Sequence, residues 1–497
     1  MFEIAIEALV TVLDPSRIGF MLLGISLGIL VGLLPGLSGT VGMSLLLPFI
    51  FGMDPFTGMA LLIGMVAVVH TADTFPSVLL GIPGSSGSQA TIMDGHPLAK
   101  KGQATRALGA AFFCSMVGGI IGGIVLFLTI PIVRPIVLSF SSPELFMLSL
   151  LGLSMVGLLS GKSPMKGIIS GLLGLALGSI GAAPAVAEYR YTSDFIYLFN
   201  GIPFAVVALG LFAFPVMIEM LSDNRSVSKG NKIVSGGLLT GIKDAIRNKW
   251  LVLKSAILGS VVGFIPGLGG SVVDWLSYGF AQKTVKNNHF GSGDIRGVIA
   301  PESANNAKEG GALIPTLMFG IPGSGTTAIL LGGLTLMGLQ AGPNMLTSGL
   351  PVTLSIIWTL VIANIFGVLL CLLLTRPISR ISTIPANKLV PFLFIILLIG
   401  SFQSTKSWGD ILFFVLIGLL GLVMHSLDWP RPPFLIGFVL SLSAERYLWI
   451  SMDRYEFAWL THPIVIVIGA LIVVFLFGGY FVKRISQAYE NNKGVDV

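Results

Sequence analysis

The sequence predicts an all-α polytopic membrane protein that consists of two inverted-topology repeats with broken helices and re-entrant hairpins. Three observations predict this fold class. The chain is 54% hydrophobic and only 10% charged, with a mean hydropathy of +0.91. Each half contains two Pro-Gly interruptions of apolar runs, in the same order. Equivalent loops of the two halves carry opposite charge character.

The composition excludes a soluble protein. A soluble domain carries about 25% charged residues, so a chain with 10% cannot cover a surface that faces water. The net charge of +6 is expected from the Lys and Arg of cytoplasmic loops and does not indicate nucleic acid. Cys114 and Cys371 both lie in apolar segments, where a buried thiol is expected and no disulfide is required.

The first transmembrane repeat is predicted over residues 1–221. Its first spanning helix, 18–34, ends at Pro35-Gly36. The apolar run that follows, 40–52, is shorter than the about 20 residues that a membrane-spanning helix needs, and its length suits one arm of a re-entrant hairpin. Further apolar helical segments are predicted at 56–70, 105–130, 144–160, 164–183 and 201–221.

The second transmembrane repeat, 250–460, follows a Lys- and Arg-rich linker at 222–249 that is expected in the cytoplasm. Its first helix is interrupted at Pro266-Gly267, and a polar stretch over 291–311 comes before its second break. An extra C-terminal transmembrane helix and tail occupy 461–497. The other predicted apolar segments of the repeat are 271–285, 326–341, 351–375, 389–403, 409–425 and 432–449.

The distribution of Lys and Arg predicts that the repeats are inverted. No Lys or Arg lies between Gly39 and Lys100, whereas the equivalent stretch from Gly270 to Gly320 contains four. Beyond the second break the pattern reverses, because the first repeat gains basic residues from Lys100 onward and residues 324–375 of the second repeat have none. By the positive-inside rule, these equivalent loops face opposite sides of the membrane. Inverted repeats are a common plan of secondary transporters.

The four breaks are the expected ligand site. An unpaired backbone group in hydrocarbon costs several kcal/mol, so a broken helix is tolerated only where protein, water or a ligand satisfies it. A helix N-terminus after a break presents free N–H groups that suit a carboxylate. A hydroxyl beside a break can also bond back to its own helix. The predicted substrate-binding residues are Pro35, Gly36, Ser38, Gly39, Pro83, Gly84, Ser85, Ser86, Pro266, Gly267, Gly269, Gly270, Asn305, Asn306, Pro322, Gly323, Ser324 and Thr326.

Side-chain oxygens near the breaks are expected to hold a coupling ion, Na⁺ or H⁺, and no other cofactor is expected. His70 could titrate in a proton path, but a packed or loop histidine is the favoured interpretation. Whether His70 and Asp73 take part in coupling is left open. The candidate Na⁺ ligands are Ser38, Asp73, Asp274, Glu302, Asn305 and Thr327.

No motif predicts catalysis. Gly24-Ile25-Ser26-Leu27-Gly28 matches G-x-S-x-G but lies within an apolar helix, without the strand–turn–helix context that this motif requires. The sequence contains no H-E-x-x-H, no Walker A motif and no Cys/His metal set. We therefore expect that the chain is not an enzyme.

Several motifs resemble one known family. The most specific is Pro301-Glu302-Ser303-Ala304-Asn305-Asn306, accompanied by Asp94-Gly95-His96-Pro97 and by two Gly-Ile-Pro-Gly-Ser segments that start at Gly81 and Gly320. Over nearly its whole length the sequence is similar to the large membrane subunit of the tripartite tricarboxylate transporters (TctA-type).

This resemblance implies a large permease subunit in the bacterial inner membrane that imports carboxylates, tricarboxylate or related organic anions, with a Na⁺ or proton gradient. It implies two partners, a small four-helix membrane subunit and a periplasmic solute-binding protein, and it is compatible with a homodimer. It also implies kinship with symporters that carry paired hairpins across the membrane by an elevator mechanism. The alternative function is a stand-alone cation-coupled carboxylate symporter or exchanger. A membrane-embedded enzyme or assembly scaffold would require a reactive triad or metal set.

Overall fold

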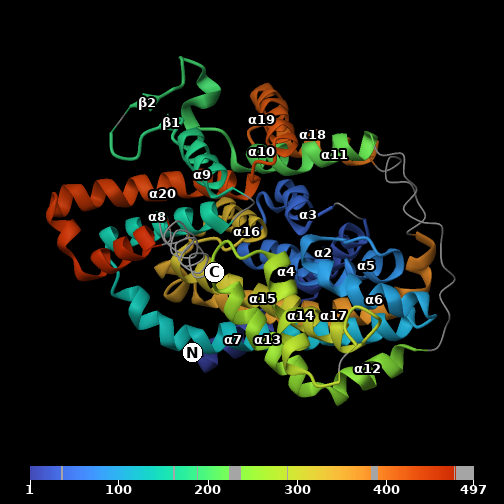
Figure 1. The fold of residues 1–497 in the computed structure, drawn as a ribbon. Coiled ribbons are helices and arrows are strands. Elements are labelled where there is room, and N and C mark those ends of the chain that lie inside the picture. The colour runs from blue at the N-terminus through green and yellow to red at the C-terminus, as the bar shows by residue number, and fades with distance from the viewer. Residues whose placement is uncertain are drawn as a thin grey trace, which may run out of the picture. The chain divides into compact units, whose positions relative to one another are not determined.

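The structure, a computed structural model, is helical almost throughout (Figure 1). It describes residues 1–34, 37–159, 163–186, 188–222, 237–287, 289–381, 390–474 and 476. Within these residues, seven helices are long and apolar enough to cross a membrane, and six shorter apolar helices have 10–17 residues. The predicted all-α polytopic class is confirmed.

The chain forms two compact units, and each unit takes segments from both halves of the sequence. Unit 1 comprises Met1–Leu138 and Ile202–Arg431, and unit 2 comprises Ser139–Gly201 and the chain from Pro432 onward. The boundaries predicted above follow the sequence repeat and therefore differ from those of the compact units. Of the predicted linker 222–249, residues 223–236 lie outside the described residues.

Unit 1 contains all four predicted breaks. Its elements are α1 (Phe2–Val12), α2 (Pro15–Leu33), α3 (Gly39–Leu46), η1 (Leu47–Ile50), α4 (Pro55–Ala72), α5 (Thr74–Leu80), η2 (Ser86–Ser88), α6 (Gln89–Lys100), α7 (Ala104–Leu138), α10 (Phe204–Ala208), η4 (Leu209–Ala213), α11 (Phe214–Ser222), α12 (Leu238–Arg247), α13 (Lys249–Gly263), α14 (Gly270–Thr284), α15 (Arg296–Phe319), α16 (Gly325–Leu336), η5 (Pro343–Leu346), α17 (Leu350–Ile381), α18 (Val390–Phe402) and α19 (Trp408–Ser426).

Unit 2 contains a small antiparallel hairpin as well as helices. In the hairpin, Gly181 pairs with Arg190. The predicted C-terminal helix begins at residue 463 and is described as far as 474. The other elements are α8 (Ser142–Leu159), α9 (Pro164–Gly178), β1 (Gly181–Ala182), β2 (Tyr189–Arg190), η3 (Ile196–Asn200), α20 (Arg431–Tyr455), whose first residue stands at the unit boundary, and η7 (Ala458–Thr461).

Glycines allow equivalent helix pairs of unit 1 to pack backbone against backbone. A β-carbon on Gly28 of α2 would lie 2.8 Å from the carbonyl oxygen of Met65 in α4, and Gly259 of α13 lies against the Ala304 carbonyl of α15 in the same way. Gly28 and Gly259 each stand seven residues before the proline of a break. Each of the pairs α2–α4 and α13–α15 therefore has a close backbone contact at an equivalent position, and small residues permit such contacts between membrane helices.

The polar stretch over 291–311 contributes most of a helix, α15, that is buried along nearly its whole length. Glycines of α7 and α13 lie directly on its backbone: Gly122 faces the Ala307 carbonyl, and Gly259 faces that of Ala304. Because its neighbours carry glycines on these faces, α15 can lie deep in unit 1 although its sequence is polar. Its polar side chains consequently point into the interior of the unit.

Candidate functional site

The two Gly-Ile-Pro-Gly-Ser segments adopt the same local structure. Both α5 and α15 end in a left-handed glycine, Gly81 with φ 68° and Gly320 with φ 70°, a conformation that glycine adopts without steric cost. Ser85 and Ser324 then form capping boxes at the start of the next helical segment. These segments are helix breaks, as the sequence predicts.

The breaks of one half contact the turns of the other half reciprocally. A β-carbon on Gly39 would lie 3.7 Å from Thr326 Oγ1, and one on Gly270 would lie 3.1 Å from the Cα of Gly87. Gly39 and Gly270 each stand four residues after the proline of a break, whereas Gly87 and Thr326 each stand six residues after the turn glycine. Reciprocal contacts of this kind are what a two-fold relation between two elements produces.

Equivalent residues of the two halves also contact each other directly. His70 of α4 and Glu309 of α15 both stand eleven residues before the turn glycine, and His70 Nε2 lies 3.1 Å from Glu309 Oε1. Ala67 and Asn306 both stand fourteen residues before it, and Asn306 Nδ2 donates to the Ala67 carbonyl at 3.3 Å. Equivalent positions of the two halves therefore meet where α4 crosses α15.

Glu302 of α15 is enclosed by hydroxyl groups. Thr74 Oγ1 donates to both carboxylate oxygens at 3.1 Å, Thr91 Oγ1 donates to Oε1 at 2.8 Å, and Ser115 Oγ donates to Oε2 at 2.9 Å. The Glu302 side chain is buried, and all of these hydrogen bonds come from neutral hydroxyl groups. These hydroxyls stabilise a charge whose burial would otherwise be costly.

Four further buried ionisable side chains form a chain of contacts from α4 to α15. Asp73 accepts a hydrogen bond from Ser85 Oγ, and its Oδ2 lies 3.7 Å from His70 Nδ1. On the other side of the imidazole, Glu309 contacts His70 and also forms an ion pair with Lys308. His70 thus lies between two carboxylates and is packed in the polar centre beside Asp73.

Asparagines of α15 contribute amide groups to the same centre. Asn306 Nδ2 donates to Thr71 Oγ1 and to Asn364 Oδ1, both at 2.8 Å. Neither side-chain atom of Asn305 has a hydrogen-bond partner among the described residues, and the side chain is 0% exposed. Asp274 of α14 accepts from the Ala90 N–H at 2.6 Å through Oδ2, while its Oδ1 lacks a partner in this part of the chain.

The structure places the predicted residues in four groups. Pro35 and Gly36 lie outside the described residues. Two hydroxyls serve mainly their own helices, because Ser38 caps α3 and Thr327 belongs to the capping box of α16. The predicted residues brought to the centre or to the contacts between breaks are Gly39, Asp73, Gly84, Ser85, Gly270, Asp274, Glu302, Asn305, Asn306 and Thr326.

The remaining predicted residues shape the turns. The N–H of Gly267 donates to the Gly323 carbonyl at 2.8 Å. This bond joins the break at Pro266-Gly267 to the Pro-Gly-Ser turn at 322–324. Gly269 precedes the first residue of α14 as its N-cap. The two Pro-Gly-Ser turns differ in exposure: Pro83 and Ser86 of the first turn are exposed, whereas Pro322 and Gly323 of the second are buried. Pro266, in the break at 266–267, is also buried.

Sequence analysis missed Lys308, Glu309 and Asn364, together with the hydroxyls around Glu302. A signal for Glu309 was available, since Glu302, Asn305 and Glu309 recur at helical spacing and mark one face of α15. Lys308 is one of the four basic residues between Gly270 and Gly320 that were counted for the positive-inside rule. Asn364 and Ser115 each stand among apolar neighbours in a long helix, where no pattern distinguishes them.

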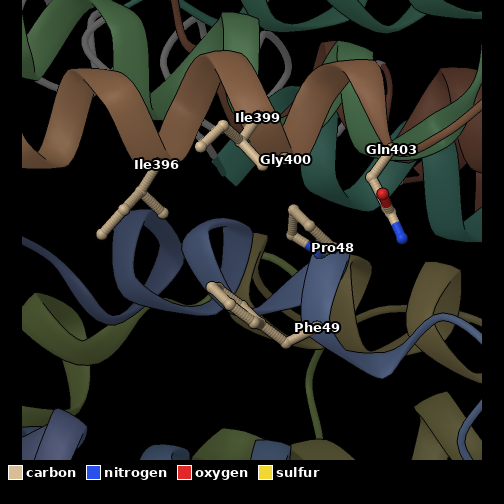
Figure 2. Close-up of a pocket in the computed structure, with 6 residues that line it drawn as sticks. All are labelled: Pro48, Phe49, Ile396, Ile399, Gly400 and Gln403. Atoms are coloured by element: carbon tan, nitrogen blue, oxygen red, sulfur yellow. The ribbon is translucent and has the colours of Figure 1, made fainter. Parts of the chain in front are cut away.

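A surface pocket of about 320 Å³ lies apart from this polar centre, between η1 and α18. Figure 2 shows Pro48 of η1 opposite Gly400 of α18, with Gln403 at one side. A neighbouring pocket of about 350 Å³ is lined almost wholly by apolar side chains, including Leu34 and Leu37 beside the first break. Neither lining contains a charged side chain, and Gln403 is the one polar side chain that lines the first pocket.

Helices broken in matched places around a closed, charged interior define a multi-pass membrane protein of the transporter class. The comparison with known proteins specifies this class. The Tripartite tricarboxylate transporter TctA family matches residues 18–436, and the chain belongs to that family. The resemblance inferred from the sequence motifs is thereby confirmed.

Two relatives from Agrobacterium vitis are similar to the chain. One, described as an uncharacterized 52.8 kDa protein in the TAR-I ttuC' 3'region, is 32% identical over 88% of this chain and 87% of its own length. The other, an uncharacterized protein in the TAR-II ttuC' 3'region, is 35% identical over 38% of this chain and 79% of its own length. No solved structure matches the chain.

Proposed function

We propose that the chain is the large permease subunit of a binding-protein-dependent secondary transporter in the bacterial inner membrane, which imports tricarboxylates or related organic anions with a Na⁺ or proton gradient. The observation that carries the proposal is the convergence of the breaks on one buried polar centre. Helix N-termini at Gly39, Gly270 and Ser324 supply N–H groups for an anion. Lys308 supplies a positive side chain within the same centre.

The repeat suggests how such a site alternates between the two sides of the membrane. The reciprocal contacts support a two-fold relation between the halves, and the alternation of Lys and Arg supports its inverted orientation. The centre is closed, since Glu302 and Asn305 are at most 1% exposed. A ligand can therefore enter and leave only if the hairpin segments around the breaks move, and we assign them an elevator-like motion.

The partners in this proposal are a small four-helix membrane subunit and a periplasmic solute-binding protein. The binding protein would deliver the anion to the permease, and a cation bound beside the anion would offset the cost of desolvating its carboxylates. A stand-alone symporter would have the same internal site and differ only in needing no partner.

Uptake of radiolabelled carboxylates into proteoliposomes tests the proposal. The chain is reconstituted alone and with both partners, under an imposed Na⁺ gradient, a proton gradient or neither. Uptake that requires the partners and one gradient is the expected result, and the effective gradient identifies the ion. Uptake by the chain alone would favour the stand-alone symporter. ATP-dependent uptake, or none under any gradient with the partners present, would contradict secondary transport.

A further inference from the structure

The side chain of Asn305 has two unpaired polar ends in the interior of unit 1. A β-carbon on Gly87 would lie 2.6 Å from Asn305 Oδ1 and 3.1 Å from Nδ2, so the amide faces the segment that follows the first Pro-Gly-Ser turn. Neither atom has a partner among the described residues, and the side chain is fully buried. Buried polar groups are nearly always hydrogen-bonded. An amide with both ends unpaired therefore indicates a place that ligands occupy.

Asp274 belongs to the face of α14 that packs against α15. The helices α14 and α15 run antiparallel: Ser277 Oγ donates to the Ala300 carbonyl at 2.8 Å, and at the other end a β-carbon on Gly270 would lie 3.2 Å from Lys308 Cε. Asp274 shares a helix face with Gly270 and Ser277, at spacing i, i+4 and i+7, and this face is directed toward the stretch of α15 between Ala300 and Lys308 that contains Asn305. Its carboxylate has one free oxygen, Oδ1.

The charges around Asn305 are divided along α15. Glu302 precedes it by three residues and lies with Asp274 on the acidic side, whereas Lys308 follows it by three residues and approaches Gly270 at the N-terminus of α14. The acidic side suits a cation. The lysine, together with the helix N-terminus, suits an anion. Asn305 lies between the two sides and can serve both.

We propose that Asn305 links the two transported species: its Oδ1, with Asp274 Oδ1, coordinates a Na⁺ ion, while its Nδ2 donates to a carboxylate of the substrate on the Lys308 side. This inference rests on the proposed carboxylate transport. Hard cations take carboxylate and amide-carbonyl oxygens as ligands. A single carboxylate with a free oxygen matches a monovalent ion.

The two ligands should raise each other's affinity. The centre contains four buried carboxyl groups, those of Asp73, Asp274, Glu302 and Glu309, against one lysine and one histidine. Na⁺ bound to Asp274 adds positive charge beside the anion and fixes the orientation of the Asn305 amide, with its N–H₂ group directed to the anion. We therefore expect bound Na⁺ to increase the affinity for the carboxylate, and the carboxylate to increase the affinity for Na⁺ by the same factor.

The experiment measures thermal unfolding of the purified full chain while Na⁺ replaces choline at constant ionic strength. Wild type should be stabilised saturably by Na⁺. Asp274→Asn and Asn305→Ala should weaken the apparent Na⁺ affinity at least tenfold. Asn305→Asp keeps an oxygen ligand but loses the donor, so it should retain the Na⁺ response and lose uptake of radiolabelled citrate and succinate. Size-exclusion elution shows whether each variant is folded.

Asp94→Asn is the matched control. Asp94 is equally buried in unit 1, but its carboxylate is occupied by the Tyr278 hydroxyl and by backbone N–H groups such as that of Gly293. This variant should melt at a lower temperature and keep the wild-type Na⁺ titration.

Three results would overturn the inference: an unchanged Na⁺ titration in Asn305→Ala, wild-type uptake by Asn305→Asp, or stabilisation of wild type by protons and not by Na⁺. The proposed function would survive each of them if gradient-driven carboxylate uptake persists. It would itself fail if no carboxylate is transported under either gradient with the partners present, whatever the Na⁺ titration shows.

Discussion

Replacing Gly87 with alanine separates the function of the polar centre from its stability. The new β-carbon would lie 2.6 Å from Asn305 Oδ1. An ordinary contact needs about 3.5 Å, so the amide must move by roughly 1 Å. The backbone at Gly87 is not left-handed, and the nearest neighbours of the new carbon all belong to the Asn305 side chain, which can rotate. We expect the fold to tolerate the change and the ligand site to lose its amide.

The size of the effect follows from the lost hydrogen bond. A hydrogen bond to a charged group contributes about 1.5–3 kcal/mol, which corresponds to roughly a 10- to 100-fold loss of carboxylate affinity. The Asn305 side chain can rotate away from the new methyl group, so we expect a loss of stability no larger than about 1–3 kcal/mol, the usual cost of overpacking. Carboxylate uptake in proteoliposomes and thermal unfolding in detergent measure the two effects.

Gly279→Ala is the control for this variant, since a β-carbon at Gly279 of α14 would meet no atom within 4 Å. It should leave uptake at the wild-type level. If Gly87→Ala transports as well as Gly279→Ala, Asn305 does not contact the substrate and the geometry proposed for the site is wrong. If Gly87→Ala fails to insert or unfolds, the β-carbon has displaced a helix and not the amide.

Three further changes test the surroundings of the site. Glu302→Ala removes the acceptor shared by three buried hydroxyls and should destabilise unit 1 by about 1–3 kcal/mol. Glu302→Gln keeps an acceptor and should recover much of this loss in thermal unfolding. An equal loss in both variants would show that the charge of Glu302 matters and its hydrogen bonds do not. Thr40→Cys with Thr326→Cys, whose hydroxyl oxygens lie 3.5 Å apart, should form a disulfide on oxidation that blocks uptake until it is reduced; uptake that persists in the cross-linked protein would mean that these breaks need not separate. Partial burial opposes ionisation of Asp294, in the loop before α15, but hydrogen bonds from Arg296 and from the His289 N–H outweigh it and lower its pKa. The folded-state pKa lies below the ordinary value of 3.8, so this aspartate stabilises the fold above that pH and the contribution is lost as the pH falls through the folded-state pKa. Asp294→Asn should flatten this acid limb of a stability–pH curve, and an unchanged limb would assign it to other carboxylates.

Much of the local structure could be predicted because short-range rules decide it. The Gly-Ile-Pro-Gly-Ser segments break a helix wherever they occur, since a left-handed glycine ends the helix and a serine caps the next one. Asp54 before Pro55 is a typical helix start, and its side chain caps α4. The helix over 296–319 could not be recognised in the same way, because its polar residues are typical of a loop until their burial between α7 and α13 is known.

The sequence by itself determined the membrane class, the transporter family and the matched breaks, because composition, turn residues and motifs are properties of short stretches of chain. Only the tertiary structure decided which break meets which turn. Gly39 contacts the second turn and Gly270 the first, and His70 meets its own equivalent, Glu309. These contacts join residues far apart in the chain, and they depend on how glycines let the helices approach. Burial then selected, among many polar residues, the few whose unpaired atoms can bind a ligand.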